Sequence, residues 1–394
     1  MEGNVSAIRL FFAFLRLGCT AFGGPAMVKY IQDLVCKRHQ WVDEKDFRQG
    51  VALVQTIPGA TAMQAAAYAG LRAGRGIGSL AAYVGFGLPA MMLMLVLTWI
   101  YQNAMDISMV VSAFNGLKVI VVAIVLNALI SFGKKIVKGL ADGVLAAVAA
   151  GIIAAGYSPV AAIIVSGLAG IFLYSRAYPQ EVKADSDQDE KFNLSWFFSR
   201  NEVRFALWCI LAVLAILAIL LLLEPKLFQF AVMMMKIDFF AYGGGYASLP
   251  LMFHELVDKR GLMDAKVLMD GTALGQVTPG PIVITATFAG LILYGLAGAL
   301  VGSWAIFTPS FLILLFAAPV FHRLRDDYRF RRVMRGVLAS FVGLLAAVLY
   351  SFVIAISWTI PGILLAVAAT AALLRGVDIL YVVLAGAIVA VIFL

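Results

Sequence analysis

The chain has 394 residues, of which 63% are hydrophobic and 13% are charged, and its formal net charge is +8. Soluble globular domains carry about 25% charged residues, so this composition excludes that class and predicts an all-α polytopic membrane protein. The basic residues stand in short clusters between apolar runs. This pattern indicates membrane topology and contact with lipid headgroups, and nucleic acid is not expected as a partner.

Six apolar elements are expected in the first half of the chain, residues 1–175, and each is read as a membrane crossing. The first is read as an uncleaved spanning helix, because no basic region or cleavage signal precedes it. An amphipathic stretch, 26–40, separates the first two elements. The six elements cover 6–22, 43–73, 77–101, 107–133, 139–155 and 158–175.

A polar linker over residues 176–202 has the composition of a solvated connector and is expected on the cytoplasmic side. One further apolar helix, 203–225, follows it. The second half, 226–394, then repeats the six-element order. The sequence therefore predicts two membrane repeats and about 13 spans in total.

Glycine and proline motifs recur at a constant spacing. Ala21-Phe22-Gly23-Gly24-Pro25 returns 220 residues later as Ala241-Tyr242-Gly243-Gly244-Gly245. Gln55-Thr56-Ile57-Pro58-Gly59 returns after 221 residues as Gln276-Val277-Thr278-Pro279-Gly280. Such duplication inside apolar sequence is typical of transporters that are built from two related halves.

The basic residues of the loops predict that the second half is inverted. Arg72 and Arg75, for example, have no basic counterpart between Tyr294 and Gly298, and three other loop pairs also reverse. The positive-inside rule then places the N-terminus in the cytoplasm and the C-terminus outside, with helix 203–225 reversing the orientation. One segment disagrees, and it could instead lie along the membrane as an amphipathic helix. Its basic residues are Lys29, Lys37, Arg38, Lys45 and Arg48.

The two Pro-Gly pairs predict broken helices at mid-membrane. Pro58 and Pro279 lack an N–H, and the residues that follow them begin new half-helices whose first N–H groups have no partner within the helix. Such an N-terminus carries a partial positive charge and binds anions. The alternative is that each Pro-Gly pair only kinks a packed helix.

Polar residues and glycines beside these breaks complete the expected substrate site. Two inverted copies would direct two half-helix N-termini at one central anion. The Gly-Gly pairs would expose backbone N–H groups to a ligand or would permit tight packing. The expected substrate-binding residues are Gly23, Gly24, Gln55, Pro58, Gly59, Thr61, Gln64, Gly243, Gly244, Gln276, Thr278, Pro279, Gly280 and Thr285.

Arg16 and Lys236 are the charged residues expected at the same site. They occupy equivalent positions, each inside an apolar element and shortly before the glycine pair. A charge at mid-membrane costs about 3 kcal/mol even on the milder scales, so such residues usually face a cavity. The alternative is that both side chains snorkel to the interface. Asp238 has no counterpart at Gly18, and its expected role is either to neutralise Lys236 or to carry a coupling proton. Lys118 and Asp270, each near a helix end, are weaker candidates.

Metal and catalytic motifs are missing from the sequence. The three cysteines and three histidines are scattered without ligand spacing. No nucleophile elbow, Walker A sequence or zinc-protease motif is present. We therefore expect no cofactor, no metal and no enzymatic activity.

Several motifs together resemble the chromate ion transporter family in its long, two-domain form. They are Phe14 to Gly18, Phe22-Gly23-Gly24-Pro25, Gln55 to Gly59, Gly85-Phe86-Gly87-Leu88-Pro89, Phe240 to Tyr246 and Gln276 to Pro281. The resemblance implies an inner-membrane anion transporter with chromate efflux as its activity and sulfate as an isosteric competitor. The chain departs from the pattern at Ala60, where proline is common, so the two halves are expected to contribute unequally.

These observations lead to an expected function with two alternatives. We expect a secondary transporter that exports chromate across the inner membrane and confers chromate resistance. The first alternative is a carrier of sulfate or another oxyanion that imports its substrate. The second is a membrane-embedded protein that binds or senses an anion without turnover. Membrane lipid is an expected partner, and the apolar surface would allow a homodimer.

Overall fold

The computed structural model describes residues 5–21, 26–104, 106–178, 194–321 and 327–393. Within these ranges every regular element is a helix, and no strand is present. Five of the helices are long and apolar enough to cross a membrane. The prediction of an all-α polytopic membrane protein is confirmed, and the chain is a multi-pass membrane protein.

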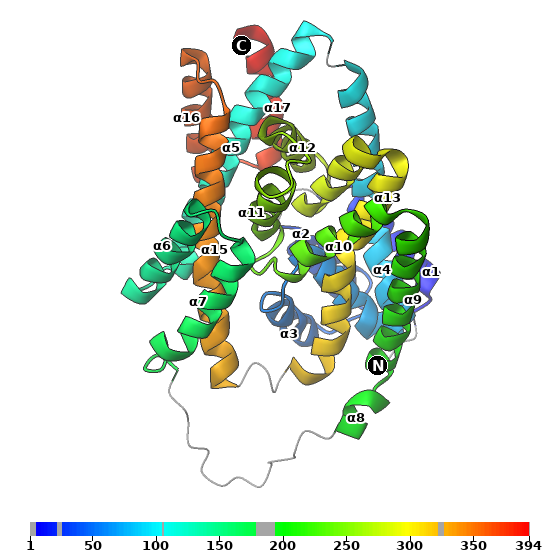
Figure 1. Ribbon diagram of the computed structural model, residues 1–394. Coiled ribbons are helices and arrows are strands. Elements are labelled where there is room, and N and C mark those ends of the chain that lie inside the picture. The colour runs from blue at the N-terminus through cyan, green and yellow to red at the C-terminus, as the bar shows by residue number, and fades with distance from the viewer. Residues whose placement is uncertain (1–4, 22–25, 105, 179–193, 322–326, 394) are drawn as a thin grey trace.

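Figure 1 shows two groups of long helices with shorter helical segments between them. One group packs around α4 and α13 and is drawn on the right. It consists of α1 (Ala7–Gly18), α4 (Thr61–Ala104), α9 (Asn201–Leu223), α10 (Pro225–Phe239) and α13 (Thr285–Ala317). The other group packs around α5 and α15. It consists of α5 (Ser108–Ile136), α6 (Leu140–Ala154), α7 (Pro159–Leu173), α15 (Tyr328–Ala355), α16 (Ile360–Leu374) and α17 (Ile379–Phe393).

The shorter segments carry the breaks in the chain. Those of the first half pack on α4, and those of the second half contact both groups. In the first half they are α2 (Ala26–Gln32), the π-helical turn η1 (Asp33–Arg38) and α3 (Glu44–Val54). In the second half they are η2 (Gly245–Ala247), α11 (Ser248–Phe253), η3 (His254–Asp258), α12 (Ala265–Val277) and η4 (Ile282–Ile284). A short helix, α8 (Leu194–Ser199), precedes α9, and the turn η5 (Ala318–Val320) ends α13.

The first two elements of the sequence form hairpins and do not cross the molecule. Arg9, near the start of α1, lies 5.5 Å from the ring of Trp41, which follows η1. Asp46, at the start of α3, binds Arg72 at 2.6 Å and Tyr68 at 3.0 Å. The sequence predicts that each of these elements crosses the membrane fully, and the structure differs from that expectation. The reason is length, because α1 has 12 residues and α3 has 11, or about 16–18 Å at 1.5 Å per residue against a hydrocarbon core of about 30 Å.

These hairpins remove the one disagreement in the loop charges. The chain turns back at Gly74 and Arg75 inside α4, and the Val5 N–H donates to the Ala73 carbonyl at 3.0 Å. The start of α1, the end of η1, the start of α3 and the turn in α4 therefore lie at one end of the molecule. We call this end the linker end, because α7 also ends there. Lys37, Arg38, Lys45 and Arg48 consequently lie with Arg72.

The second half repeats the arrangement at the opposite end. Asp264 caps α12 by accepting from the Lys266 N–H, as Asp43 caps α3 through the Lys45 N–H. The α13 chain turns at Tyr294 and Gly295, as α4 turns at Gly74 and Arg75. A further contact identifies the end at which the second-half hairpin begins. Tyr101, at the far end of α4 from its turn, donates to Asp270 of α12 at 3.1 Å.

The two halves interlock through close contacts between small residues. Helix α15 of the second half packs on α6 and α7 of the first, where a Cβ on Gly343 would lie 2.0 Å from the Ala146 carbonyl oxygen. Helix α5 of the first half packs on α16 and α17 of the second, where a Cβ on Gly116 would lie 2.1 Å from the Ala390 Cβ. Small residues allow helices to approach closely in a membrane. Helices α5 and α15 are thus each held by the last two helices of the other half.

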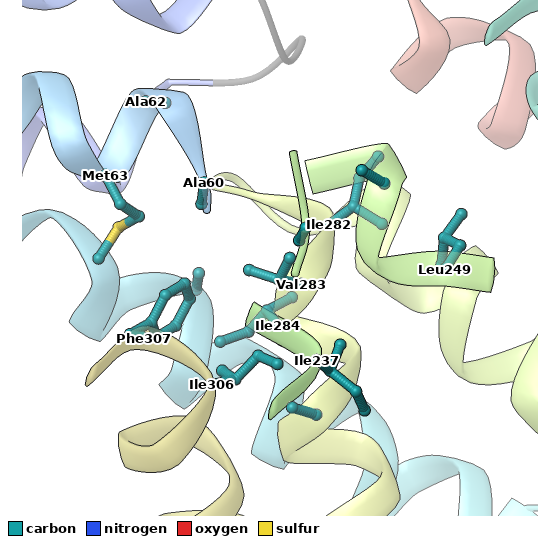
Figure 2. Close-up of a cluster of buried hydrophobic side chains, with 14 of the residues drawn as sticks. Ala60, Ala62, Met63, Ile237, Leu249, Ile282, Val283, Ile284, Ile306 and Phe307 are labelled. Carbon is teal, nitrogen blue, oxygen red and sulfur yellow. The ribbon is translucent and has the colours of Figure 1, made fainter. Parts of the chain in front are cut away.

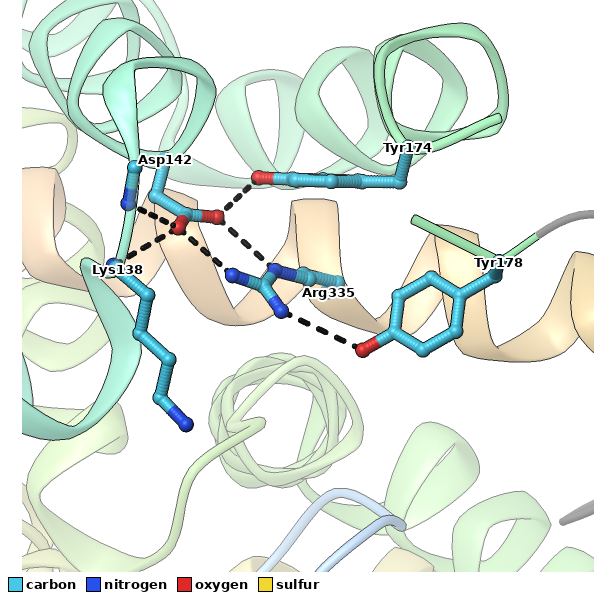
Figure 3. A network of polar contacts seen from close by, with 6 residues as sticks. Lys138, Asp142, Tyr174, Tyr178 and Arg335 are labelled. Atoms are coloured by element: carbon cyan, nitrogen blue, oxygen red, sulfur yellow. Dashed lines mark hydrogen bonds and ion pairs between the residues drawn. The ribbon is translucent and has the colours of Figure 1, made fainter. Parts of the chain in front are cut away.

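A polar network near the linker end fastens this crossover (Figure 3). The Asp142 carboxylate accepts two bonds from the Arg335 guanidinium, at 3.1 and 2.9 Å, and a third from the Tyr174 hydroxyl. Asp142 is almost fully buried. The bidentate geometry suits arginine and does not suit lysine.

Asp142→Asn is expected to destabilise the protein, because Arg335, whose side chain is only 26% exposed, then loses its counter-ion. Breaking such a pair costs about 3 kcal/mol at the lower end of the usual range. Thermal unfolding in detergent measures the effect, with Asp378→Asn at an exposed helix cap as the matched control. Arg335→Lys should destabilise the protein less than Asp142→Asn does, because it keeps the ion pair and loses only the bidentate geometry. Equal midpoints for Asp142→Asn and Asp378→Asn would contradict the assigned role.

Candidate anion site

The Pro-Gly break of each half binds the other half at the centre of the molecule, and the two contacts are reciprocal. The Gly59 N–H donates to the Ala241 carbonyl at 2.9 Å, and the Gly280 N–H donates to the Ala21 carbonyl at 3.1 Å. Each bond joins the Pro-Gly break of one half to the end of the first element of the other half. We call residues 55–60 and 278–284 the two tips.

The glycines of the tips adopt a backbone conformation that disfavours any other residue. The φ angle is +111° at Gly59 and +118° at Gly280. A Cβ on Gly59 would lie 2.2 Å from the Ser310 Cβ, and a Cβ on Gly280 would lie 2.8 Å from the Ala90 Cβ. Both the strain and the close approach require glycine at these positions.

A half-helix begins after each tip, as the sequence predicts, but the two starts differ. Helix α4 begins at Thr61, and none of the described residues accepts a hydrogen bond from the N–H groups of Thr61, Ala62 or Met63. In the second half Pro281 supplies no N–H, and the turn η4 comes before α13. The first tip therefore presents the more regular helix N-terminus, with its partial positive charge.

Apolar side chains surround these N–H groups. Figure 2 shows Ala60 and Met63 of the first half across from Val283, Ile284 and Phe307 of the second. All five side chains are buried. Excluding water in this way strengthens each interaction between an N–H donor and a bound anion.

Polar side chains at the tips are buried unequally. The Gln64 amide donates to the Pro58 carbonyl at 2.6 Å and to the Ser310 carbonyl at 3.2 Å, so Gln64 holds the first tip. The Gln276 amide nitrogen is buried without a described partner. The Gln55 side chain, at the corresponding position, is exposed.

The predicted hydroxyls are mostly engaged with the backbone. Thr278 donates to the Gly275 carbonyl at 3.0 Å, and Thr285 donates to the Ile282 carbonyl at 2.8 Å. Their oxygens remain available as acceptors. Thr61 is partly buried, and a Cβ on Gly244 would lie 3.3 Å from its hydroxyl oxygen.

The structure describes the glycine pair of the second half. Gly243 and Gly244 have φ angles of +101° and +94°, which places this segment against the start of α4 in a conformation that only glycine adopts readily. The corresponding residues Gly23 and Gly24 lie outside the described residues.

The structure does not bring Arg16 and Lys236 to the tips as a pair. Arg16 is exposed on the face of α1 that also carries Ile8 and Phe12, opposite the face that packs on α4. Lys236 binds Glu255 of η3 at 2.6 Å, and its positive charge is therefore compensated. Equivalent positions in the two halves thus serve different purposes, and the expected cation pair is not formed.

Three polar contacts were not predicted from the sequence, although it names Asp238, Lys118 and Asp270 as candidate residues. Glu255 is almost fully buried and also lies near Lys259 and Arg260. Lys118 and Asp270 form a buried pair at 3.8 Å. Ser310 joins Tyr83 and Asp238 beside the first tip. Glu255 carried a usable signal, because an acidic residue inside an apolar run is costly unless it has a partner.

Comparisons with known proteins agree across nearly the whole chain. An uncharacterised transporter of Methanocaldococcus jannaschii is 39% identical over 384 residues, which covers 97% of this chain and 93% of that protein. A chromate transport protein of Cupriavidus metallidurans is 29% identical and covers 93% and 88%. A chromate transport protein of Pseudomonas aeruginosa is 26% identical and covers 86% and 79%. No solved structure matches the chain.

A family match follows the two halves found in the fold. The family described as Chromate transporter matches residues 8–171 and again residues 228–391. The first match spans α1 to α7, and the second spans α10 to α17. This double match confirms the two-domain form that the motifs predict, and the chain belongs to the chromate transporter family.

Proposed function

We propose that this protein is a secondary transporter that exports chromate, a tetrahedral dianion, and that it has no enzymatic activity. The reciprocal hydrogen bonds made by the two tips carry the proposal, because each joins the tip of one half to the end of the first element of the other half. N–H groups at the start of α4, enclosed by apolar side chains, suit a small oxyanion. Relatives named as chromate transport proteins support the choice of substrate.

The proposed binding groups are backbone N–H groups supported by amides and hydroxyls. Thr61 to Met63 and Ile282 to Val283 would donate N–H groups to the anion, and the glycines of the tips would allow the close approach. Gln276 would add a directional donor, since its amide nitrogen has no described partner. Arg16 and Lys236 have no role in this arrangement.

The membrane potential favours export. An inside-negative potential contributes about 2.3 kcal/mol per charge per 100 mV, so a departing dianion gains about 5 kcal/mol per 100 mV. We place the linker end in the cytoplasm of a cell with this potential across its inner membrane. Support comes from the basic residues of that end, now including Lys37, Arg38, Lys45 and Arg48. The N-terminus is then cytoplasmic and the C-terminus outside.

The interlocking of the two halves restricts how the anion site could open to one side of the membrane and then to the other. If one repeat rocked against the other, α15 of the second half would have to separate from α6 and α7 of the first, which it contacts closely. We propose instead that the group around α5 and α15 moves against the group around α4 and α13. The tips between them would then open first to one side and then to the other.

Flux through proteoliposomes tests the function. The purified protein should release radiolabelled chromate faster than protein-free liposomes do, and a potential that is negative inside should accelerate release. Sulfate should compete. Sulfate flux that is insensitive to chromate would favour the sulfate alternative, and flux equal to that of protein-free liposomes would favour an anion-binding protein without turnover.

A further inference from the structure

Asp238 is a buried carboxylate without a compensating charge. Its side chain in α10 is fully buried, and Oδ2 accepts from the Ser310 N–H at 2.7 Å. Oδ1 has no hydrogen-bond partner among the described residues, and none of the described ion pairs includes Asp238. An ionised carboxylate in this setting is costly, so the site favours a form in which a cation or a proton is bound.

Ser310 connects this carboxylate to the first tip. It follows Pro309 in the middle of α13, and its hydroxyl lies 3.0 Å from the Tyr83 hydroxyl. Its carbonyl accepts from Gln64, which also holds the Pro58 carbonyl. Gly59 packs directly on the Ser310 side chain. A change at Asp238 therefore reaches the start of the anion site through one residue.

The other half lacks this carboxylate although its backbone is arranged in the same way. Gly18 occupies the equivalent position, and a Cβ there would lie 2.5 Å from the Phe86 carbonyl oxygen and 3.2 Å from Pro89 Cγ. Pro89 corresponds to Pro309. The first half thus leaves no room for a side chain at this position, so the carboxylate is a feature of the second half alone.

Other titratable groups near Asp238 are accounted for. Tyr83 of α4 reaches it through Ser310. Lys236 lies on the same helix and is bound by Glu255 of η3. Helices α9, α11 and α13 also pack against α10, and none of their described side chains forms an ion pair with Asp238.

We propose that Asp238 is the proton site of this transporter and that a proton and the oxyanion bind together. An ionised Asp238 would repel a dianion at the adjacent tip, and a protonated Asp238 would not. By linkage, the anion then promotes proton binding to the same degree as the proton promotes anion binding. This inference rests on the proposed function, because it assigns the coupling of that same site. A proton that leaves with the dianion reduces the net charge moved from two to one, and an inside-negative potential still favours export of that charge.

Binding of sulfate at different pH values tests the linkage, because sulfate stays a dianion over the range used. Wild-type affinity should rise about tenfold or more between about pH 8 and about pH 5, since one removed charge repulsion of about 1.4 kcal/mol is tenfold. Asp238→Asn should bind tightly at every pH, and Asp106→Asn, at an exposed loop position, should behave as wild type. An unchanged pH profile in Asp238→Asn would overturn the proposal.

A second measurement needs no variant. Sulfate added to weakly buffered wild-type protein should cause proton uptake near pH 8, and binding without uptake would overturn the proposal. If sodium strengthens sulfate binding at fixed pH while pH has no effect, Asp238 is a cation site and the proton assignment is wrong.

The proton site can also fail separately from the proposed function. Infrared spectra should contain the carbonyl band of a protonated carboxylic acid that Asp238→Asn lacks. Absence of this band from wild-type protein at about pH 5 overturns the proton assignment. If the band is present but neither sulfate nor chromate binds at any pH, the proposed function and its coupling fall, while Asp238 remains the proton site.

Discussion

Gly59→Ala is expected to reduce chromate flux about a hundredfold. The added Cβ would meet Ser310 at 2.2 Å in a backbone with φ at +111°, so the tip must move. Strain and overpacking together cost on the order of 3 kcal/mol, and about 1.4 kcal/mol corresponds to tenfold in rate. Flux in proteoliposomes, normalised to monodisperse protein, measures the effect.

The control and a graded comparison follow from the same geometry. Gly133→Ala is the matched control, because nothing lies within 4 Å of the position of its added Cβ in α5. Gly280→Ala should be less severe than Gly59→Ala, since its Cβ would meet Ala90 at 2.8 Å. Flux through Gly59→Ala equal to that through Gly133→Ala would contradict the assigned role of the tips.

Lys118→Met is expected to destabilise the protein strongly, and Asp270→Asn in addition should restore most of the loss. Lys118 lies 3.8 Å from Asp270, whose other oxygen accepts from Tyr101. The side chains are 14% and 3% exposed, so removal of the cation leaves a charge buried without compensation. Such losses amount to about 3–5 kcal/mol, whereas replacing both members of a pair is often neutral.

Thermal unfolding of the two single variants and the double variant forms a double-mutant cycle. The predicted coupling makes the double variant more stable than Lys118→Met alone. Losses that simply add would show that the two side chains act independently. Flux through the double variant then reports whether the pair also serves transport.

Much of the fold follows from the sequence because the helix boundaries carry local signals. The breaks at Pro58 and Pro279, the extra helix before α10 and the order of elements agree with the structure. Asp43 and Asp264 cap equivalent helices, which shows that the repeat extends to single hydrogen bonds. The loop charges predict the inverted second half, because Lys and Arg are costly to carry across a bilayer.

The hairpins formed by the first two elements of each half could not be predicted from the sequence in the same way. An apolar run interrupted by Pro58-Gly59 has the same composition whether its second part continues across the bilayer or turns back. The distinction rests on contacts such as Asp46 with Arg72, which join residues far apart in sequence. The basic residues between Lys37 and Arg48 were the one signal of the hairpins in the sequence, because full crossings would place these charges outside.

The sequence predicts where the backbone breaks of the candidate site lie, but it does not predict which charged side chains pair with one another. Proline and glycine restrict the chain locally, so the tips could be placed from residue types alone. Arg16 and Lys236 matched in position but not in surroundings, since Glu255 faces one and nothing of opposite charge is paired with the other in the described structure. The partner of a buried charge is a tertiary property.

Location of a bound chromate tests the central claim most directly. Chromium scatters anomalously, so crystals of the protein with chromate would reveal the anion without reference to its surroundings. The account predicts the chromium between the two tips, within hydrogen-bond reach of the N–H groups of Thr61 to Met63. Chromium bound at Lys236 and Glu255, or at Arg16, with the tips empty would contradict it.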